Sequence, residues 1–338
     1  MTPEQLRGIR ATLPLFVQRA APSPPLLDFC RFYGIDFADR LPGVQHLAGT
    51  VSSGPHTVVA HLWLQAGADS NLLLLHGYFD HTGLFGNLIQ QGLARNCNVL
   101  IFDLPGHGLS SGEPAVIDDF SDYSQALADV LAAAQLPDLP LWVVAQSTGC
   151  AALVDFVRKH TWPFAAAVLL APLVRPVGWL RVRVAHMLLQ RFIDSVPRKF
   201  SENSSDRKFL EFVQSDPLQS ARLPLRWVGA LRRWLAALPA HDLGVGPALV
   251  LQGDADKTVA WRYNLKAVDQ LFPGSQVEIL PGAGHQLANE SADIYQRYLA
   301  VTDRWLASRG VPVRTPAPEL EQAVTAHGQV AGDEHAGS

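Results

Sequence analysis

The sequence predicts an α/β fold in which a mostly parallel central sheet carries helices on both faces and a helical cap is inserted into the chain. Three observations predict it. Short, nearly continuous apolar runs recur from Asn71 onward, helix-length amphipathic segments separate them, and this alternation is interrupted between about Pro172 and Pro239. Continuous apolar runs are typical of strands buried on both faces, as in a parallel sheet covered by helices.

Each segment of the chain then has an expected place. Residues 1–40 form an N-terminal helical segment, with one or two short helices over 4–33. The stretches 43–51 and 57–65 are paired strands that turn at 53–55, which gives the sheet an antiparallel edge. The core spans 41–172 and 241–309, and the cap spans 173–240. Residues 310–338 are rich in Pro, Ala, Gly, Gln and charges, so we expect a disordered tail.

The apolar runs are NLLLL, NVLIF, LWVVA, AAVLL, ALVLQ and QVEIL, at 71–75, 98–102, 141–145, 166–170, 248–252 and 276–280. In open parallel sheets, reactive groups gather at the carboxyl ends of the strands. Candidate polar residues follow five of these six runs within a few positions: His76 and Tyr78, Asp103, Ser147, Asp256 and His285. The sequence therefore predicts that the functional site lies at this edge of the sheet.

Composition and charge narrow the function classes. The chain has 338 residues, 48% of them hydrophobic, and a net charge of −4, which gives no sign of a nucleic-acid partner. Three cysteines, Cys30, Cys97 and Cys150, lack metal-ligand spacing and suit a reducing compartment. The N-terminus lacks the pattern of a secretory signal, and no run approaches the ~20 apolar residues of a membrane span. We expect a cytoplasmic protein, with a peripheral position at the inner membrane face as a further expectation.

Ser147 lies where the apolar run LWVVA meets a small-residue turn and a helix-like segment. A nucleophilic serine is presented on such a strained turn, and the residues two before and two after it must be small. These are Ala145 and Gly149, so Ala145 stands where a glycine is usual. An ordinary strand-to-helix turn would give the same short pattern.

The residues downstream strengthen the interpretation of Ser147 as a nucleophile. His285, in LPGAGHQL, is the candidate base, and Asp256, in GDADKTV, is the candidate acid that orients it. Asp254 competes for the acid role, but its position favours capping the turn. We interpret Asp103 and His107 as residues that fix their own turn, and His81 as a tether for the neighbouring loop.

Charge on the substrate oxygen requires donors already in place. The backbone amide of Thr148, directly after the serine, is one candidate. The other is the amide of Tyr78, because His76 and Gly77 let the backbone turn tightly after NLLLL.

The motifs HGYFDH, FDLPGHGLSSGE, AQSTG, GDADKTV and PGAGH, in this order, resemble the bacterial lysophospholipase and monoacylglycerol lipase branch of the α/β-hydrolase superfamily, over roughly residues 60–305. The resemblance implies an α/β-hydrolase fold and a serine hydrolase without a metal or organic cofactor. It also implies that Ser147, Asp256 and His285 are the nucleophile, acid and base, and that the amides of Tyr78 and Thr148 form the oxyanion hole. Ala145 and the pair Phe79 and Asp80 depart from the branch, so pocket shape and chain-length preference can differ.

We therefore expect hydrolysis of carboxylic esters, above all of single-chain acyl lipids such as a lysophospholipid or a monoacylglycerol, through an acyl-enzyme. A thioesterase or an acyltransferase would use the same triad, and a ligand-binding homologue without turnover is the alternative outside enzymes. Epoxide hydrolases and dehalogenases of this superfamily carry aspartate where Ser147 stands.

The expected cap is basic, with twelve Lys and Arg against five Asp and Glu over 173–240. Solvated helix faces would explain this charge. Contact with anionic lipid would explain it as well, with Trp179, Leu180, Trp227 and Trp234 as candidate interfacial side chains.

Overall fold

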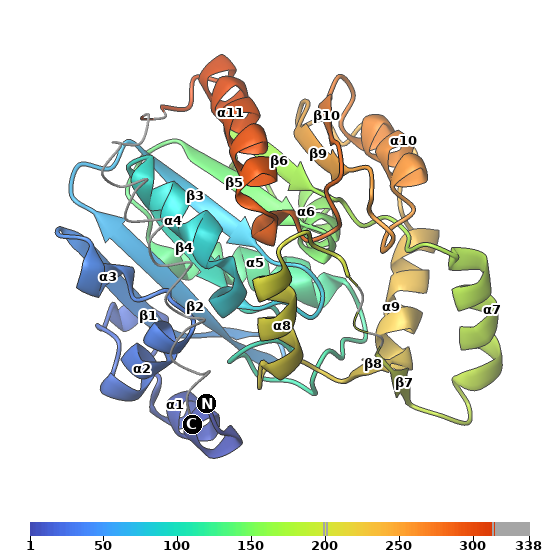
Figure 1. Cartoon of the computed structure of the whole chain (residues 1–338), viewed down its shortest axis with the longest axis horizontal. Coiled ribbons are helices and arrows are strands. Elements are labelled where there is room, and N and C mark those ends of the chain that lie inside the picture. Colours follow the sequence, from blue (N-terminus) through green and yellow to red (C-terminus); the bar gives the residue numbers. More distant parts are fainter. Residues whose placement is uncertain (199, 201, 313, 315–338) are drawn as a thin grey trace.

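A mixed eight-stranded sheet, in the order β1-β2-β4-β3-β5-β6-β9-β10, forms the centre of the computed structural model, which describes residues 1–198, 200, 202–312 and 314 (Figure 1). β2 pairs antiparallel with β1 and β4, and the other neighbours are parallel. The predicted mostly parallel sheet with an antiparallel edge is confirmed. Its strands are β1 Val44–Ser53, β2 His56–Gln65, β3 Ser70–Leu75, β4 Cys97–Phe102, β5 Leu141–Gln146, β6 Ala166–Leu170, β9 Leu249–Gly253 and β10 Gln276–Leu280.

Helices cover both faces of the sheet because the central strands are apolar on both. In β3, Leu72 and Leu74 pack into one hydrophobic layer while Leu73 and Leu75 pack into the other. The first layer includes α1 (Pro3–Thr12), α2 (Pro24–Phe32), α4 (Gly86–Ala94) and α11 (Ala292–Ser308). The second includes α5 (Ser121–Ala134), α6 (Thr148–Val157), α9 (Leu225–Ala236) and α10 (Trp261–Leu271).

Four short elements complete the body. They are η1 (Phe16–Gln18), α3 (Phe37–Arg40), η2 (Thr82–Phe85) and η3 (Leu287–Asn289). η2 and η3 follow the carboxyl ends of β3 and β10, and both loops contribute to the candidate site below.

The expectation that every apolar run is buried on both faces is wrong for QVEIL. β10 is one of the two outer strands of the sheet, and Val277 and Ile279 are 42% and 37% exposed. An edge strand pairs on one side only, and here one of its faces is open to solvent. Gln276 and Glu278, on the other face, are exposed and half-buried, and these polar residues distinguish QVEIL from the fully apolar runs.

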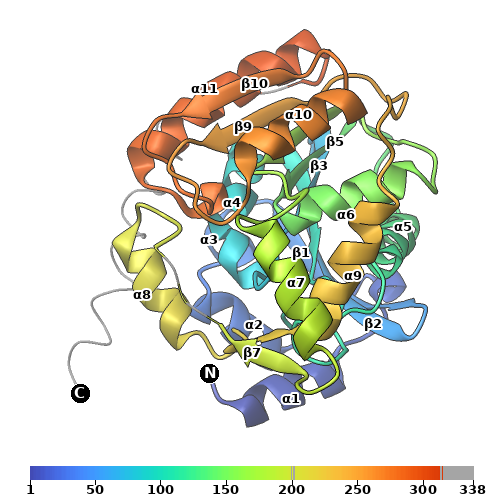
Figure 2. The same ribbon diagram turned by 90° about the vertical axis from the view of Figure 1, so that its right-hand side faces the viewer.

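Between β6 and β9 the chain forms α7 (Trp179–Leu189), β7 (Ser195–Pro197), α8 (Arg207–Ser215), β8 (Arg222–Pro224) and then α9. β7 and β8 pair as a small antiparallel ribbon that the sequence analysis did not predict. α9 packs its apolar face on the body, whereas α7 lies on the outer side of α9 (Figures 1 and 2). His186 is the one α7 side chain that is buried, and its Nε2 lies 3.1 Å from the Leu225 carbonyl.

The expected interfacial side chains of the cap need correction. Trp227 and Trp234 are only 7% and 5% exposed, because they face the hydrophobic layer under α9. Trp179 is half-buried, and Leu180 is exposed. No helix in the described part of the chain is long and apolar enough to cross a membrane. The predicted disorder of the tail concerns residues that lie, apart from 310–312 and 314, outside the described ones.

Candidate active site

Ser147 occupies a sharp turn between β5 and α6, with φ at 51° and ψ at −110°. Residues with a side chain rarely adopt this left-handed backbone conformation. It costs of order 1–3 kcal/mol and persists only where the surrounding structure imposes it. Gly149 shows why the turn needs small residues: a Cβ at this position would lie 2.5 Å from the Leu75 carbonyl oxygen. Ala145, two residues before the serine, is fully buried in β5. The elbow therefore closes with alanine at that position.

The structure brings Ser147, His285 and Asp256 together from three different loops. His285 Nε2 lies 2.9 Å from Ser147 Oγ, and His285 Nδ1 lies 2.8 Å from Asp256 Oδ2. All three residues are at most 6% exposed. These distances suit proton transfer from the serine to an imidazole whose other nitrogen donates to a carboxylate.

The environment of Asp256 keeps its carboxyl group ionised. Burial opposes ionisation, but the neighbouring His285 and the backbone amides of Val259 and Thr258 outweigh it and lower the pKa of Asp256. Those amides donate to Oδ1 at 3.1 and 2.7 Å, and Gln252 Nε2 donates to Oδ2 at 3.1 Å. The carboxylate is therefore fixed in both position and charge.

The competing residues are placed elsewhere. Asp254 Oδ1 accepts from the Gly282 amide at 2.8 Å, in the turn before His285. Asp103 accepts from the amides of Thr82 and Leu109, both at 2.7 Å, and so holds two loops together. His107 Nδ1 lies 2.9 Å from the Pro105 carbonyl, and burial lowers its pKa to about 3.

The two candidate oxyanion donors flank the serine. Thr148 is the first residue of α6, where a backbone amide has no intrahelical acceptor. The loop carrying Tyr78 packs on the serine, since a Cβ at Gly77 would lie 3.4 Å from Ser147 Cβ. In the described residues, neither the Tyr78 nor the Thr148 amide donates to a carbonyl of the loops.

Sequence reasoning missed a buried polar network between the Tyr78 loop and the His285 loop. Gln286, the residue after the candidate base, donates to Asp80 Oδ1 at 2.8 Å and accepts from Gln146, the residue before Ser147. Burial raises the pKa of Asp80. The one signal in the sequence was that Gln146 stands directly before Ser147 and Gln286 directly after His285.

A second missed contact joins the body to the cap. Asp216, which follows α8, lies 2.8 Å from His81 Nε2 and accepts from the Tyr33 hydroxyl at 2.7 Å. Burial disfavours both charges, but each partner offsets it: the pKa of His81 is raised and that of Asp216 is lowered. His81 does tether its loop, and the tether reaches the cap.

One cluster has metal-ligating side chains. Cys30, His46 and His61 are buried, with one ligand atom from each within 4.8 Å of the others. His46 Nε2 and His61 Nδ1 already lie 3.0 Å apart and share a hydrogen bond. Burial raises the pKa of Cys30 to about 12, and the described residues supply three ligand atoms where a structural zinc site takes four. We assign this cluster no metal.

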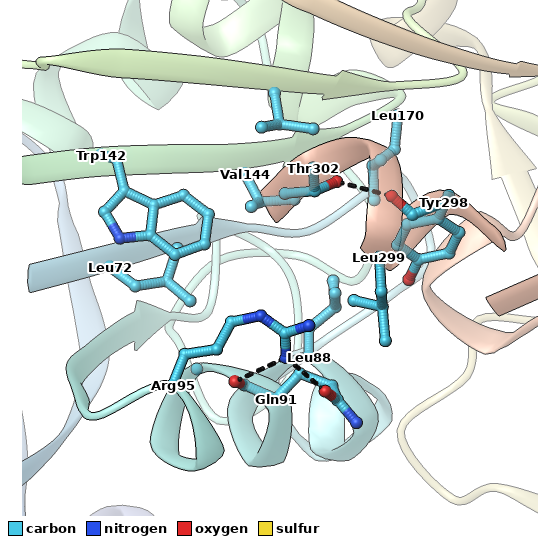
Figure 3. Close-up of a pocket in the computed structure, with 12 residues that line it drawn as sticks. Leu72, Leu88, Gln91, Arg95, Trp142, Val144, Leu170, Tyr298, Leu299 and Thr302 are labelled. Carbon is cyan, nitrogen blue, oxygen red and sulfur yellow. Dashed lines mark hydrogen bonds between the residues drawn. The ribbon is translucent and has the colours of Figure 1, made fainter. Parts of the chain in front are cut away.

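A small cavity lies between α4, α11 and the sheet, apart from the triad (Figure 3). Its volume is about 20 Å³ and its walls are mainly apolar. Its one charged side chain, Arg95, is bound to Asp303 and Gln91. A second, open cleft of about 610 Å³ lies at the base of α7 and is lined by Arg175, Arg181 and Arg183, among others.

Comparisons with known proteins show the family and the fold of the chain. The family model described as "Serine aminopeptidase, S33" matches residues 66–292. The chain is similar to the monoglyceride lipase of Homo sapiens, at 24% identity over 81% of this chain and 94% of the relative. It is also similar to the pimeloyl-[acyl-carrier protein] methyl ester esterase of Chromobacterium violaceum, at 32% identity over 75% of this chain and 96% of the relative.

Solved structures show the same fold. A soluble variant of the monoglyceride lipase of Saccharomyces cerevisiae, in complex with a substrate analog, superposes with a TM-score of 0.66 at 17% identity, over 79% of this chain and 94% of that one. Family model, relatives and fold together show that the chain belongs to the serine aminopeptidase S33 family of α/β-hydrolases, within the monoacylglycerol lipase-like branch of carboxylic ester hydrolases.

Proposed function

We propose that the protein hydrolyses carboxylic esters of single-chain acyl lipids, such as a monoacylglycerol or a lysophospholipid, through an acyl-enzyme on Ser147. The observation that carries the proposal is the contact series from Ser147 Oγ to His285 Nε2 and from His285 Nδ1 to Asp256, at 2.9 and 2.8 Å. The first link lets the serine hydroxyl give its proton to the imidazole near neutral pH, and the second holds the imidazole in the tautomer that accepts it.

The reaction follows from the groups in place. Ser147 Oγ attacks the ester carbonyl carbon while His285 Nε2 takes the hydroxyl proton. The carbonyl oxygen becomes an oxyanion, which the amides of Tyr78 and Thr148 stabilise. Collapse of the tetrahedral intermediate breaks the bond to the leaving alcohol, and His285 returns the proton to it. Water then attacks the acyl-enzyme in the same way and releases the carboxylic acid.

The acyl donor and the acceptor that ends the cycle separate this proposal from its alternatives. A thioesterase would take its acyl group from a thioester, and an acyltransferase would pass it to an alcohol in place of water. Both would use the same serine. A product analysis with ester and thioester substrates, in the presence and absence of glycerol, distinguishes them: we expect free acid from esters as the main product.

The replacement Ser147→Ala tests the reaction itself. It should abolish hydrolysis of short p-nitrophenyl esters and covalent labelling by a fluorophosphonate, while circular dichroism shows an unchanged fold. Labelling that persists in Ser147→Ala would refute the proposed nucleophile. An unlabelled wild-type protein would favour a ligand-binding homologue without turnover.

We also propose that α7 docks on an anionic lipid surface. Its exposed apolar side chains include Leu180 and Leu188, at 65% and 66%, and Phe192, just after the helix, is 81% exposed. Arg175, Arg181 and Arg183 line the cleft at its base. Apolar side chains next to arginines are the combination by which peripheral proteins bind anionic lipid.

Cosedimentation with vesicles tests the docking surface. Binding should be stronger to anionic than to neutral vesicles and should fall with added salt. The double variant Leu188→Ser with Phe192→Ser should weaken it. Val277→Ser, which removes an apolar side chain that is 42% exposed on β10, is the control away from α7. Binding indifferent to lipid charge and to the α7 changes would contradict this part of the proposal.

A further inference from the structure

The loop that carries His285 is held by a segment of the cap. The backbone amides of His285 and Gln286 both donate to the Asn203 carbonyl oxygen, each at 2.8 Å. The amide just before them, of Gly284, donates to Glu290 Oε1 at 2.6 Å. Three consecutive amides around the candidate base therefore depend on one cap carbonyl and one carboxylate.

Glu290 links the same loop to the cap with its other oxygen. Oε2 accepts from the Ser205 amide at 2.9 Å and from the Ser205 hydroxyl. The neighbouring Ser204 hydroxyl donates to the Asn289 carbonyl at 2.6 Å. Glu290 is only 3% exposed, so solvent does not compete freely for its acceptor positions.

The His285 loop and the cap segment at Asn203 also pack tightly against each other. A Cβ at Gly284 would lie 2.5 Å from the Asn203 carbonyl oxygen and 3.2 Å from Glu290 Oε1. The absence of a side chain at Gly284 is thus what lets the cap backbone reach the amides of the candidate base. The contact therefore requires the Asn203 carbonyl to lie directly against Gly284.

We propose that Asn203, Ser205 and Glu290 form a clasp that positions His285, so that the base is correctly placed only when this part of the cap is seated. The inference rests on the proposed function of the site. Glu290 is a positioning residue: it holds the main chain from which the imidazole projects. A misplacement of about 1 Å at a reacting group can lower the rate by about 10²-fold.

The clasp also divides the cap into two parts. The segment 203–206 and Asp216 are bound to the loops of the site, whereas α7 lies outside them with His186 as its one buried side chain. The clasp therefore does not include α7.

The clasp is tested by graded substitutions. Glu290→Ala should lower kcat for a p-nitrophenyl ester by about 10- to 100-fold with little change in KM. Glu290→Gln keeps one carbonyl oxygen and should restore part of the loss, and Ser205→Ala, which removes the hydroxyl but keeps the amide, should cost less than Glu290→Ala. Arg226→Ala is the matched control, since it breaks exposed ion pairs of the cap with Asp118 and Glu113 but touches no part of the clasp.

A readout without turnover separates this inference from the proposed function. The far-downfield proton resonance of the bond between His285 Nδ1 and Asp256 should be present in the wild type and in Arg226→Ala, and broadened or lost in Glu290→Ala. A normal kcat with an unchanged resonance in Glu290→Ala would overturn the clasp, and so would an equal loss in Arg226→Ala. If Glu290→Ala does not fold, Ser205→Ala and Glu290→Gln carry the same test. A wild-type protein inactive on esters would defeat the proposed function alone, because the resonance would still report the clasp.

Discussion

The ring of Tyr78 stacks on the indole of Trp227 with ring centroids 3.9 Å apart and planes at 17°. Tyr78 carries a candidate oxyanion amide, and Trp227 belongs to α9 in the cap. The Tyr78 hydroxyl is held as well, since it donates to the Ala115 carbonyl at 2.7 Å. An aromatic pair and a hydrogen bond therefore fix the loop that carries this candidate amide.

Trp227→Ala should disturb both stability and the oxyanion donor. Removing a buried tryptophan costs about 3–5 kcal/mol of unfolding free energy. We expect a lower melting temperature and a fall in kcat, whereas Trp227→Phe should retain most of both because a ring still covers Tyr78. Trp162→Ala, which removes a half-buried tryptophan that packs on Phe164, is the control for the loss of a tryptophan. An unchanged kcat in folded Trp227→Ala would show that the stacking does not position the amide.

The turn at Ser147 predicts opposite outcomes for its two small neighbours. Gly149→Ala places a methyl group against the Leu75 carbonyl, and overpacking of this kind costs about 1–3 kcal/mol. It should displace the serine and abolish fluorophosphonate labelling. Ala145→Gly restores the usual elbow glycine and should keep labelling at the cost of about 0.5–1 kcal/mol in a strand. The measurement is the rate of fluorophosphonate labelling of the two variants. Equal rates would contradict the expectation that only Gly149 must lack a side chain.

Asp254 and Asp256 offer a matched pair of carboxylates two residues apart. Asp256→Asn should lower kcat by about 10⁴-fold, because an amide cannot hold the imidazole in the required tautomer. Asp254→Asn keeps an acceptor for the Gly282 amide and should leave kcat near the wild-type value. Steady-state kinetics on one ester checks both. A larger loss in Asp254→Asn would reverse the assignment of the acid.

Four buried histidines predict that the fold loses stability in mild acid. Burial lowers the pKa of His61 and His76 to about 4 and that of His107 to about 3, and it lowers the pKa of His46 as well. An unfolded histidine titrates at about 6.5, so below this pH the unfolded chain binds more protons. Each histidine then removes about 1.4 kcal/mol of stability per pH unit until its folded pKa is reached.

Thermal unfolding between about pH 7 and pH 5 checks this expectation. The melting temperature should fall steadily with pH. His107→Asn keeps a donor for the Pro105 carbonyl but does not titrate. The slope of its unfolding free energy against pH should therefore be smaller by the equivalent of about one bound proton. A melting temperature independent of pH over this range would mean that these side chains are not held neutral.

Much of the fold could be predicted because its signals are local. Leu72 to Leu75 form a continuous apolar run, and such a run has few alternatives to a buried strand. The order of Ser147, Asp256 and His285, each after a strand, was also readable, because the carboxyl ends of parallel strands share one edge. β7 and β8, with three residues each, are too short for any hydrophobic period to appear.

The supporting contacts of the site could not be read from the chain. The Asn203 carbonyl is a main-chain group that every residue has, and Glu290 meets Ser205 across 85 positions. Trp227 and Trp234 were misinterpreted although a signal was present. With Leu231 between them they repeat at helical spacing, which predicts one buried face rather than two interfacial rings.

The cap leaves the body after β6 and returns before β9, and these two strands are hydrogen-bonded neighbours. The two strands are parallel, so the chain leaves at the carboxyl end of β6, where the candidate site lies, and crosses back to the amino end of β9. Insertions or deletions between them can alter the elements around the candidate site while the strand register beneath stays the same. In this architecture, substrate preference can diversify in one contiguous stretch of gene without altering the reaction chemistry.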